Sequence, residues 1–361
     1  MTFEEARAAF PVLARVAYLN AGTFGPLSRP TLGAMRRYEG EELAGGRGGP
    51  PYYERMRELR SGARAAVAGV LGVEPESLAL TYSTSFACNL VLAGLDLGPG
   101  DEIVTTDCEH FGLLGALGAS PATVRVARIR DLSAARAGEA VIAEVGPRTR
   151  LLALSHVSWL TGNLLPVAEL KAETGLPMLV DGAQSAGAIP VDPRPFDFYT
   201  VSGQKWLCGP DATGALYVAD PERLRVSLPT FYSLGAYEPD GSFTVCDGAR
   251  RFDGGAIPQP SLAGLAAAIE TAPAWRFDRA RETAARCREL LARRYALVTE
   301  ADQSTLVVFR TGADSAELSA RLHDRGVLVR SLPGTDWLRV SVGYWTSDDD
   351  LDRLLAALEA G

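Results

Sequence analysis

The sequence predicts an α/β fold, in which a large domain with a doubly wound, mainly parallel sheet precedes a smaller α+β domain. Five short apolar runs end in polar or small residues, a pattern typical of buried parallel strands. Helix-like segments alternate with these runs, which implies right-handed crossovers that place helices on both faces of the sheet. The chain has 361 residues, of which 47% are hydrophobic. That length suits one large and one small globular domain.

The large domain is expected at residues 31–240, after an N-terminal segment of residues 1–30 that we place near the functional site and the small domain. The Gly-rich residues 44–53 predict a mobile loop near a site or an interface. The predicted strands are SLALTY (77–82), DEIVTTD (101–107), TRLLALSHVS (149–158), LPMLVDGA (176–183) and FDFYTVSG (196–203), and the predicted helices are 61–71, 86–95, 111–117 and 167–174.

The small domain is expected at residues 241–361. A Gly- and Pro-rich segment over residues 239–260 predicts the domain junction, and the Ala-rich residues 261–291 predict one long helix after it. Strand-like and amphipathic helical stretches then alternate, which predicts an α+β module. The strands are STLVVFR (304–310), VLVR (327–330) and LRVSV (338–342), and the helices are 316–325 and 348–358.

Composition and charge exclude several functional classes. The formal net charge of −8 would repel nucleic acid and anionic membranes, so we expect neither as a partner. The start, MTFEEARAAF, lacks the basic and apolar regions of a signal peptide, and no stretch is apolar and long enough to span a bilayer. Five cysteines without CxxC spacing are typical of a reducing compartment, and we expect a cytoplasmic protein.

Polar side chains follow the predicted strands at their carboxyl ends. Ligands of open parallel sheets bind beyond these ends, so we expect the groups that follow them to converge on one site. The three histidines of the chain form no HExxH motif or Cys/His cluster, and we predict no metal. The groups at the strand ends are Ser83-Thr84-Ser85, Cys108-Glu109-His110, Ser155-His156, Asp181 to Gln184, and Ser202 to Lys205.

Two of these groups have both a structural and a functional interpretation. Ser83-Thr84-Ser85 at a helix start is simply an N-cap, or it is a phosphate cradle of backbone N–H groups, hydroxyls and the positive end of a helix dipole. The two interpretations are compatible. Asp181 either binds loop amides or pairs with a buried cationic heterocycle.

Lys205 and His110 raise the same choice. Lys205 is one of only two lysines, and it lies in a small and apolar setting. It either extends to solvent or, when desolvated, acts as a Schiff-base nucleophile with a lowered pKa. Lys171, beside glutamates on a polar helix face, is expected to be solvated. His110 is either a core histidine or a flat ring that stacks on a cofactor.

A phosphate cradle, a carboxylate for a ring nitrogen, a stacking ring and a buried lysine together predict pyridoxal 5'-phosphate (PLP) covalently bound to Lys205. The sequence also resembles the class V branch of fold-type I PLP enzymes, which includes cysteine desulfurases, cyst(e)ine C–S lyases and isopenicillin-N-epimerase-like proteins. The resemblance covers nearly the whole chain. It rests on residues 18–27, 81–95, 100–112, 154–167, 180–187 (VDGAQSAG), 197–218 (with SGQKWLCGP) and 338–355.

The resemblance implies a role for each matching residue, and it implies a homodimer that acts on a small amino-acid substrate. The catalytic residues would be Lys205, bound to the cofactor, Asp181 on the ring nitrogen and His110 over the ring. Gln184 would lie near the phenolic oxygen of the cofactor. Thr84, Ser85, Ser202 and Gln204 would bind the phosphate, Arg339 the substrate carboxylate, and Trp159 and Gly22 other parts of the substrate.

Departures from the family pattern direct the choice of reaction. Desulfurases carry a sulfur-accepting cysteine shortly before the arginine that aligns with Arg339, whereas no cysteine follows Cys287 here. Trp159 replaces a common asparagine, as in lyase-like and epimerase-like members, and Ala256 lies near a threonine that many relatives lend to the partner subunit's phosphate site.

These departures predict a C–S β-lyase that acts on a cysteine-derived substrate. Class V aminotransferase or epimerase is the alternative. A persulfide-forming desulfurase and a PLP-fold binding protein without turnover are less favoured. A Rossmann dehydrogenase is not supported, because no GxGxxG follows a predicted strand.

Overall fold

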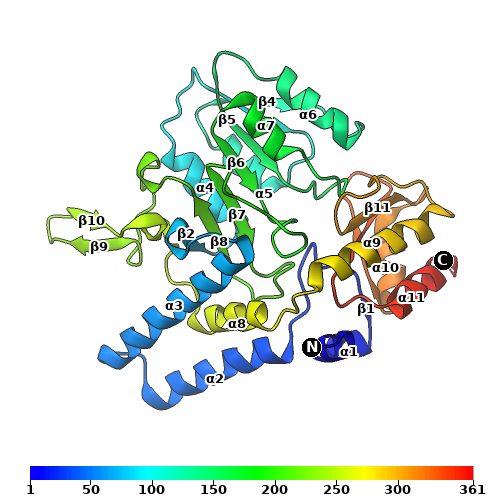
Figure 1. The fold of residues 1–361 in the computed structure, drawn as a ribbon, viewed down its shortest axis with the longest axis horizontal. Helices are drawn as coiled ribbons and strands as arrows, with labels where there is room; N and C mark the ends of the chain where they lie inside the picture. Colours follow the sequence, from blue (N-terminus) through cyan, green and yellow to red (C-terminus); the bar gives the residue numbers. More distant parts are fainter. Residues whose placement is uncertain (361) are drawn as a thin grey trace.

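The computed structural model describes residues 1–360 and contains a seven-stranded central sheet (Figure 1). Its strand order is β2-β8-β7-β6-β5-β3-β4, and only β8 runs antiparallel to its neighbours. The mainly parallel α/β sheet predicted from the sequence is therefore confirmed. The strands are β2 (Leu78–Thr81), β3 (Glu102–Thr106), β4 (Thr123–Ala127), β5 (Thr149–Ser155), β6 (Met178–Asp181), β7 (Phe198–Ser202) and β8 (Gly214–Val218).

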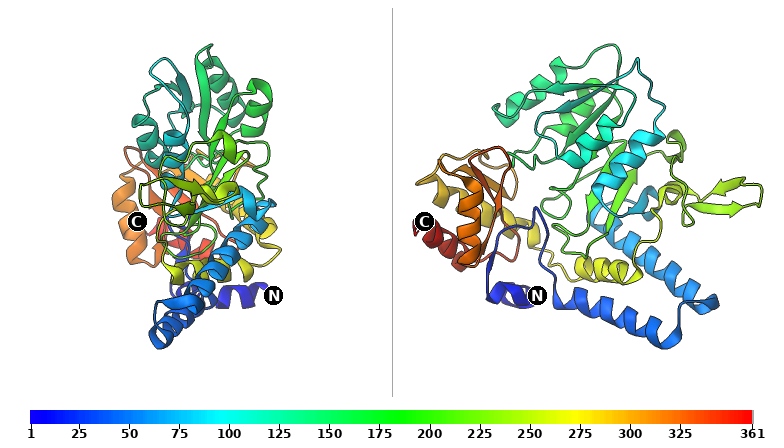
Figure 2. Two further views of the ribbon diagram at one scale, coloured as in Figure 1. Left: turned by 90° about the vertical axis from the view of Figure 1, so that its left-hand side faces the viewer. Right: turned by 180° about the vertical axis from the view of Figure 1, so that it is seen from behind.

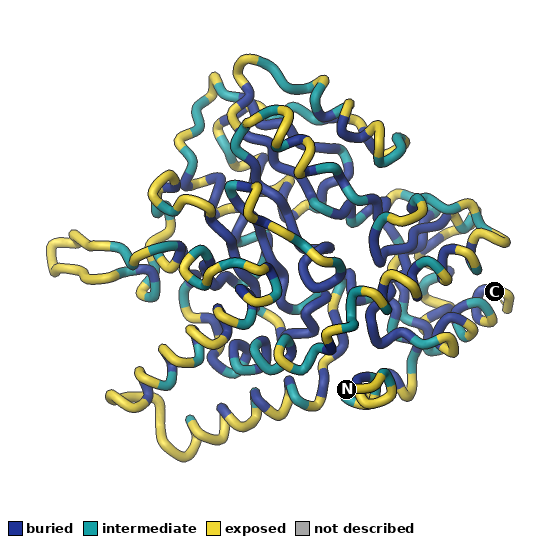
Figure 3. The backbone as a smooth tube through the Cα atoms, in the orientation of Figure 1, coloured by how far each residue is buried: buried dark blue, intermediate teal, exposed yellow. Residues whose placement is uncertain are grey.

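Helices cover both faces of this sheet because side chains alternate between the faces along each strand. Ile103 of β3 and Ala153 of β5 pack in a cluster with α4 (Thr84–Gly94) and α5 (Phe111–Gly118). Val104 and Leu152, one residue away on the same strands, pack on the opposite face with α6 (Ala134–Ala143) and α7 (Val167–Thr174). The strands form a buried layer between the helices (Figure 3).

Strands β4 and β8 are additions to the sheet that the sequence analysis did not single out. β4 is an edge strand whose burial pattern is mostly partial, so its residues lack the continuous apolar run of the central strands. β8 is short and lies between β7 and β2. Its Gly214 has no room for a Cβ atom, which would lie 2.5 Å from the carbonyl oxygen of Val201 on β7.

Two long helices, α2 (Arg29–Gly45) and α3 (Gly49–Leu71), meet at a corner in place of most of the loop predicted for residues 44–53. Only Gly46 to Gly48 separate them, and Gly46 has a positive φ of 75°. Pro50 and Pro51 lie in the first turn of α3, where a missing N–H costs nothing. Pro at a helix start therefore explains why this Gly- and Pro-rich segment is mainly helical.

The single helix predicted for residues 261–291 is divided into α8 (Gln259–Glu270) and α9 (Arg276–Ala292). Pro273 lies in the break, and proline cannot continue a helix without loss of a backbone hydrogen bond. α8 packs against α2 and α3 of the large domain, whereas α9 contacts the small domain. The residue expected as the domain boundary, 240, lies in the projecting hairpin of β9 (Leu234–Tyr237) and β10 (Phe243–Val245) (Figure 1).

The C-terminal module combines an antiparallel sheet with helices, as expected for an α+β domain. Its three strands have the order β11-β14-β13, and β12 pairs in parallel with β1 from the N-terminal segment. The elements are β1 (Ala17–Tyr18), β11 (Leu306–Arg310), α10 (Ser315–Asp324), β12 (Val327–Leu328), β13 (Arg330–Ser331), β14 (Trp337–Ser341) and α11 (Asp348–Glu359).

The N-terminal segment contacts both domains (Figure 2). Its first helix, α1 (Phe3–Ala8), contacts the small domain through Arg7. The Arg7 guanidinium donates to Asp350 Oδ2 over 2.6 Å and to the carbonyl of Trp345. The loop after β1 reaches the large domain, where Gly25 N donates to the carbonyl of Gln204 over 2.8 Å. This loop therefore lies between the two domains at the strand ends of the large sheet.

Candidate active site

The predicted polar groups follow the carboxyl ends of neighbouring strands. Asp181 is the last residue of β6, and the strand register places it opposite Ser155 of β5 and Thr200 of β7. Lys205 follows three residues after β7, and His110 follows four residues after β3. Because parallel strands align their carboxyl ends, one edge of the sheet collects these groups.

The Asp181 carboxylate is buried and held in a fixed orientation. Its Oδ1 atom accepts from Ala183 N over 2.9 Å and from Thr200 Oγ1 over 3.1 Å. Within residues 1–360, Oδ2 has no hydrogen-bond donor. One oxygen therefore fixes the side chain, and the other is free to bind a cationic N–H group.

The Lys205 side chain lies in a desolvated position beside the N-terminal loop. Burial of its ammonium lowers the pKa to about 8, an effect that the Arg339 charge increases and the Asp181 charge opposes. Gly25 packs directly on this residue, since a Cβ atom there would lie 2.1 Å from the Lys205 carbonyl oxygen. About a tenth of Lys205 is consequently uncharged at pH 7, far more than for a solvated lysine.

His110 begins helix α5 as its N-cap, and its Nδ1 atom accepts from Gly112 N over 3.2 Å. Nδ1 is therefore unprotonated. Burial, together with the Lys205 charge, lowers the pKa of His110 to about 4. The edge of its ring contacts Trp159, at 5.1 Å between ring centroids. At neutral pH this side chain is a neutral, flat ring held in a fixed position.

The start of helix α4 lies at the same edge and has unpaired backbone donors. Ser83 is the N-cap, and its Oγ atom accepts from Phe86 N over 3.2 Å. The N–H groups of Thr84 and Ser85 have no hydrogen-bond acceptor within residues 1–360. A helix start with free N–H groups binds anions through these groups and the helix dipole.

Near Lys205, the Gln204 side chain is arranged to present further donors. The Ser202 hydroxyl contacts Gln204 Oε1 at 3.0 Å, so the amide NH₂ of Gln204 is directed away from Ser202. Ser85 lies against Gly112, where a Cβ atom would be 2.3 Å from Ser85 Oγ. Because α4 and α5 also pack together, their first turns lie close to each other.

Arg339 on β14 of the small domain is a buried cation without an acidic partner. Its Nη1 atom donates to the Trp159 carbonyl over 3.0 Å, and Nη2 donates to Thr23 Oγ1 over 3.3 Å. Nε has no acceptor within residues 1–360. Burial, together with the charge of Arg330, lowers the Arg339 pKa to about 9. An unpaired buried guanidinium is costly, so this residue is suited to receive an anionic ligand.

Gly22 and Gln184 connect the N-terminal loop to both domains. Gln184 Nε2 donates to the Gly22 carbonyl over 2.9 Å, and Gln184 Oε1 accepts from Trp206 Nε1 over 3.0 Å. A Cβ atom at Gly22 would lie 2.9 Å from Arg339 Nη2, so the loop passes directly beside the guanidinium. The predicted residues therefore come together from the large sheet, the N-terminal loop and the small domain.

Two residues in this region were not assigned a role from the sequence. Thr23 accepts a hydrogen bond from Arg339, and only its position in the motif of residues 18–27 could have indicated it. Glu109 is fully buried, and its carboxylate accepts from Thr106 Oγ1 over 2.7 Å and from Ser155 N over 3.0 Å. Burial and the Asp181 charge raise the pKa of Glu109 to about 7, against the opposing effect of these hydrogen bonds.

Two features are absent from residues 1–360. No helix there is long and apolar enough to cross a membrane. No three His, Cys, Asp or Glu side chains in that part of the chain are grouped in a way that could hold a metal ion.

A family model for aminotransferase class V matches residues 18–354. The chain belongs to this family. Isopenicillin N epimerase of Streptomyces clavuligerus is 32% identical to this class V chain, over 99% of the chain and 98% of the relative. A cysteine desulfurase of Dickeya dadantii is 28% identical, over 98% of the chain and 95% of the relative.

Solved structures agree with this class V assignment. A mutant of C-DES with glycine covalently linked to its PLP cofactor has a TM-score of 0.90 and 28% identity, and covers 98% of both chains. The cystine C–S lyase C-DES in complex with its product cysteine persulfide has a TM-score of 0.88 and 29% identity, with 97% of this chain and 98% of that chain covered. The fold is that of a fold-type I PLP enzyme, and the cofactor is PLP.

The residues of this class V chain fit PLP. Unpaired N–H groups at the start of α4 suit its phosphate, the free oxygen of Asp181 suits a protonated ring nitrogen, and Lys205 is an uncharged amine in part at neutral pH. Trp159 Nε1 and Arg339 Nε are buried donors without acceptors within residues 1–360, which leaves capacity for a further anionic group. Both the cofactor and a carboxylate thus have matching groups.

Proposed function

We propose that this enzyme is a PLP-dependent C–S β-lyase that acts on a cysteine-derived amino acid. The observation that carries the proposal is a desolvated lysine at the edge of the large sheet, close to a buried arginine of the small domain that has no acidic partner within residues 1–360. A lysine of this kind exchanges its amine with that of a substrate, and such an arginine binds the substrate carboxylate. Transamination or epimerisation by the same residues is the alternative.

The chain's own residues would hold the cofactor at five points. Lys205 would bind it covalently, and Asp181 would keep its ring nitrogen protonated. When bound, PLP supplies an electron sink for the charge that develops at the substrate Cα. The second N–H of Gln184 Nε2 is free for the phenolic oxygen, because the first donates to Gly22. Thr84, Ser85, Ser202 and Gln204 would donate to the phosphate, and the neutral ring of His110 would cover the cofactor.

Arg339 and Lys205 would act on different parts of the substrate. Arg339 would fix the carboxylate and so orient the bonds at Cα. Lys205, with a pKa of about 8, would take the Cα proton as a general base. Trp159 and Gly22 adjoin Arg339 and would limit the space around the carboxylate.

A second cation favours a substrate with more than one carboxylate. Arg330 of β13 is the cross-strand partner of Arg339, and paired residues of antiparallel strands project from the same face. Arg330 is exposed and has no acidic partner within residues 1–360. A disulfide of cysteine carries two carboxylates, one for each arginine, and the similar protein C-DES is described as a cystine C–S lyase.

The cysteines of the chain support β-elimination over sulfur transfer to a protein thiol. Cys88, Cys108, Cys208 and Cys287 are buried, and burial raises the pKa of each thiol. Cys246, the fifth, follows β10 and lines a cavity beside α3, away from the residues of the proposed site. A thiol that accepts sulfur must be accessible and readily ionised.

The decisive experiment follows the absorbance of the purified holoenzyme during addition of cystine, cysteine or alanine, with pyruvate and sulfane sulfur assayed in parallel. Release of pyruvate from cystine at a rate that exceeds release from alanine supports the lyase. Conversion to the pyridoxamine form with stoichiometric release of the matching 2-oxo acid, which is pyruvate from alanine, and without pyruvate from cystine would indicate an aminotransferase. Loss of optical activity at Cα without either change would indicate an epimerase. Lys205→Ala should abolish the covalent attachment that borohydride traps.

We also propose that the enzyme functions as a homodimer in the cytoplasm. Phe24 in the N-terminal loop and Phe111 at the start of α5 are large apolar side chains exposed by 49% and 74%, close to the proposed site. Exposed apolar groups at such positions are typical of surfaces that a second subunit covers.

A further inference from the structure

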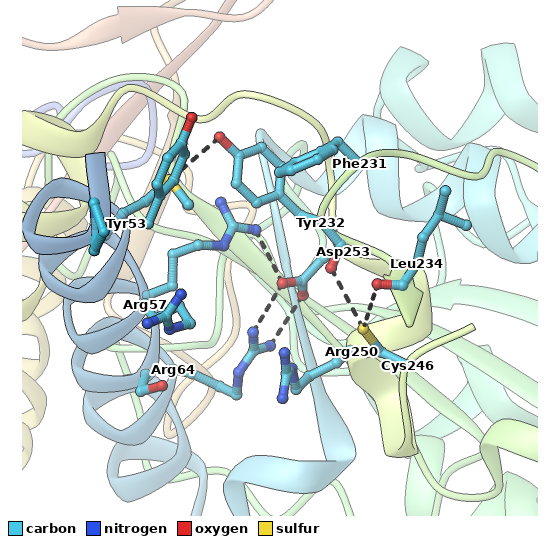
Figure 4. A pocket seen from close by; sticks show the side chains of 13 residues that line it. Tyr53, Arg57, Arg64, Phe231, Tyr232, Leu234, Cys246, Arg250 and Asp253 are labelled. Carbon is cyan, nitrogen blue, oxygen red and sulfur yellow. Dashed lines mark hydrogen bonds and ion pairs between the residues drawn. The ribbon is translucent and has the colours of Figure 1, made fainter. Parts of the chain in front are cut away.

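A cavity of about 590 Å³ lies between helix α3 and the base of the β9–β10 hairpin, away from the proposed active site (Figure 4). Arg57, Arg60 and Arg64 of α3 recur at positions i, i+3 and i+7, so one face of the helix presents all three to the cavity. Arg250, from a 3-10 helix at Gly248–Phe252, completes the group. The volume is typical of a small-molecule site.

Only one acidic side chain lines this cavity within residues 1–360, and its capacity is already used. Asp253 accepts from Arg60 Nη2 over 2.9 Å, from Arg64 Nη1 and Nη2 over 3.0 and 2.8 Å, and from Leu80 N over 2.8 Å. Four guanidinium groups therefore face one carboxylate, and three positive charges have no counterion. Such a surplus in a concave site attracts anions.

A buried donor in this cavity is unpaired. Arg60 is 6% exposed, and its Nη1 atom has no acceptor within residues 1–360. The Tyr232 ring covers its guanidinium at 4.1 Å and thereby holds it in place. Burial of a guanidinium N–H without an acceptor is unfavourable, so an anion at this position would remove a cost of the unliganded structure.

The wall of the cavity adds apolar and aromatic surface to the cationic floor. Tyr53 and Phe231 line the cavity and are exposed by 46% and 66%, and the buried Met56 lines it as well. Arg57 and Arg250 are exposed and have no ion-pair partner within residues 1–360. A ligand would meet these exposed cations first and then the buried Arg60 and Arg64 groups, which Asp253 holds in place.

We propose that this cavity binds a small multivalent anion, of the phosphate or polycarboxylate class, at a site separate from the PLP site. The bound anion would lie near one end of the Asp253 network, which joins α3 to Leu80 of β2. Strand β2 leads directly into Ser83 and the start of α4. The anion would therefore stabilise the layer that carries the proposed phosphate cradle.

The test is isothermal titration calorimetry of the PLP-loaded enzyme with pyrophosphate, citrate and ADP, in a phosphate-free buffer of low ionic strength. We expect at least one probe to bind at one site per chain, with affinity that falls as salt is added. Pyrophosphate and citrate separate phosphate from carboxylate recognition, and ADP tests the aromatic wall. Cofactor absorbance should stay unchanged, because the probe does not enter the PLP site.

The double variant Arg57→Gln/Arg250→Gln should weaken probe binding at least 10-fold. Both residues are exposed, so the fold should tolerate the change. Arg293→Gln, at an exposed arginine after α9, is the matched control and should bind as the parent does. Arg60→Met should weaken binding further, and the double variant decides the question if Arg60→Met does not fold.

Three results would overturn the proposal. The first is absence of binding of all three probes at millimolar concentration. The second is equal affinity in the parent and in the double variant. The third is a double variant that changes the sedimentation coefficient of the enzyme instead of probe affinity, because this would show that a second copy of the chain covers the cavity.

Discussion

At the scale of single residues, Arg339 shows how a functional group can oppose stability. Its guanidinium is 2% exposed and lacks an acidic partner within residues 1–360. We expect Arg339→Met to raise the thermal midpoint by a few degrees. Methionine is similar in length to arginine, and the change removes a buried charge that has no counterion. The same change should lower kcat/KM for a carboxylate-bearing substrate roughly 10- to 100-fold, the value of a charge-assisted hydrogen bond.

Thermal unfolding and steady-state kinetics measure the two effects of Arg339→Met separately. A substrate amine without a carboxylate, such as cysteamine, is the control, since its kcat/KM should change little. If kcat/KM for the amino acid equals that of the parent enzyme, Arg339 does not bind the carboxylate.

Arg330 provides a second prediction at this scale. Arg330→Gln should raise KM for cystine several-fold and leave KM for a substrate with one carboxylate nearly unchanged, because only the larger substrate reaches the exposed arginine. Competition between cystine and a monocarboxylate substrate gives the ratio directly. An equal change in KM for both substrates would mean that Arg330 does not bind a carboxylate and acts only through the electrostatic effect of its charge on Arg339.

The positions of single residues could be predicted from the sequence where a polar group ends or follows an apolar run. Lys205 and Asp181 follow apolar runs, so their place at one sheet edge could be read from the order of strands. The partners of Arg339 could not be predicted in this way. Thr23 and the Trp159 carbonyl lie 316 and 180 residues away in the chain, and only the folded arrangement of loop and domains brings them to β14.

At the scale of elements, the loop between β1 and α2 fixes the position of Lys205. Gly25→Ala would place a Cβ atom 2.1 Å from the Lys205 carbonyl oxygen, a contact that backbone atoms cannot tolerate. We expect this variant to lose most of its covalently bound PLP, measured by absorbance after gel filtration, and to unfold at a lower temperature.

Gly33→Ala is the matched control for this element. Gly33 lies within α2, where an added Cβ atom meets nothing within 4 Å. Alanine in a helix is favoured over glycine by roughly 0.5–1 kcal/mol, so this variant should keep its PLP and gain slight stability. Full PLP occupancy in Gly25→Ala would show that the loop shifts to accommodate the added Cβ atom without displacing Lys205.

Elements with a strong local signal were predicted, and those that depend on their neighbours were not. Helix α7 begins and ends where the sequence places it, at residues 167 and 174. Strand β4 was missed because an edge strand needs little apolar surface. The Ala-rich pattern concealed the break between α8 and α9, although Pro273 marked it.

At the scale of the whole molecule, the α/β fold class could be predicted from the alternation of strands and helices. The positions at which the N-terminal segment and α8 pack on the rest of the chain could not be predicted in this way. The Arg7–Asp350 ion pair joins residues 343 positions apart, and no periodicity indicates it. The packing of α8 on α2 and α3 likewise joins residues that are far apart in the sequence. Local patterns specify which elements form, and complementary surfaces decide where an element packs.

The free energy of unfolding should depend on pH, and the shifted pKa of Glu109 should cause an identifiable part of that dependence. Burial, together with the Asp181 charge, raises the pKa of Glu109 to about 7, from about 4.5 in the unfolded chain. The folded protein therefore binds this proton more tightly, and the contribution of Glu109 is full below pH 4.5 and is lost as the pH rises to 7. Burial lowers the pKa of His110 and His156 to about 4, so their contribution is instead lost as the pH falls below 6.5.

Glu109→Gln removes only the first of these effects. In the cofactor-free protein, the free energy of unfolding of this variant, relative to the parent, should rise by roughly 3 kcal/mol between pH 4.5 and pH 7. Urea unfolding at several pH values measures this difference. Glu282→Gln, at an exposed glutamate of α9, should follow the parent at every pH. A constant offset between Glu109→Gln and the parent across this range would show that the pKa of Glu109 is the same in the folded and unfolded protein, and that its hydrogen bonds from Thr106 and Ser155 offset its burial.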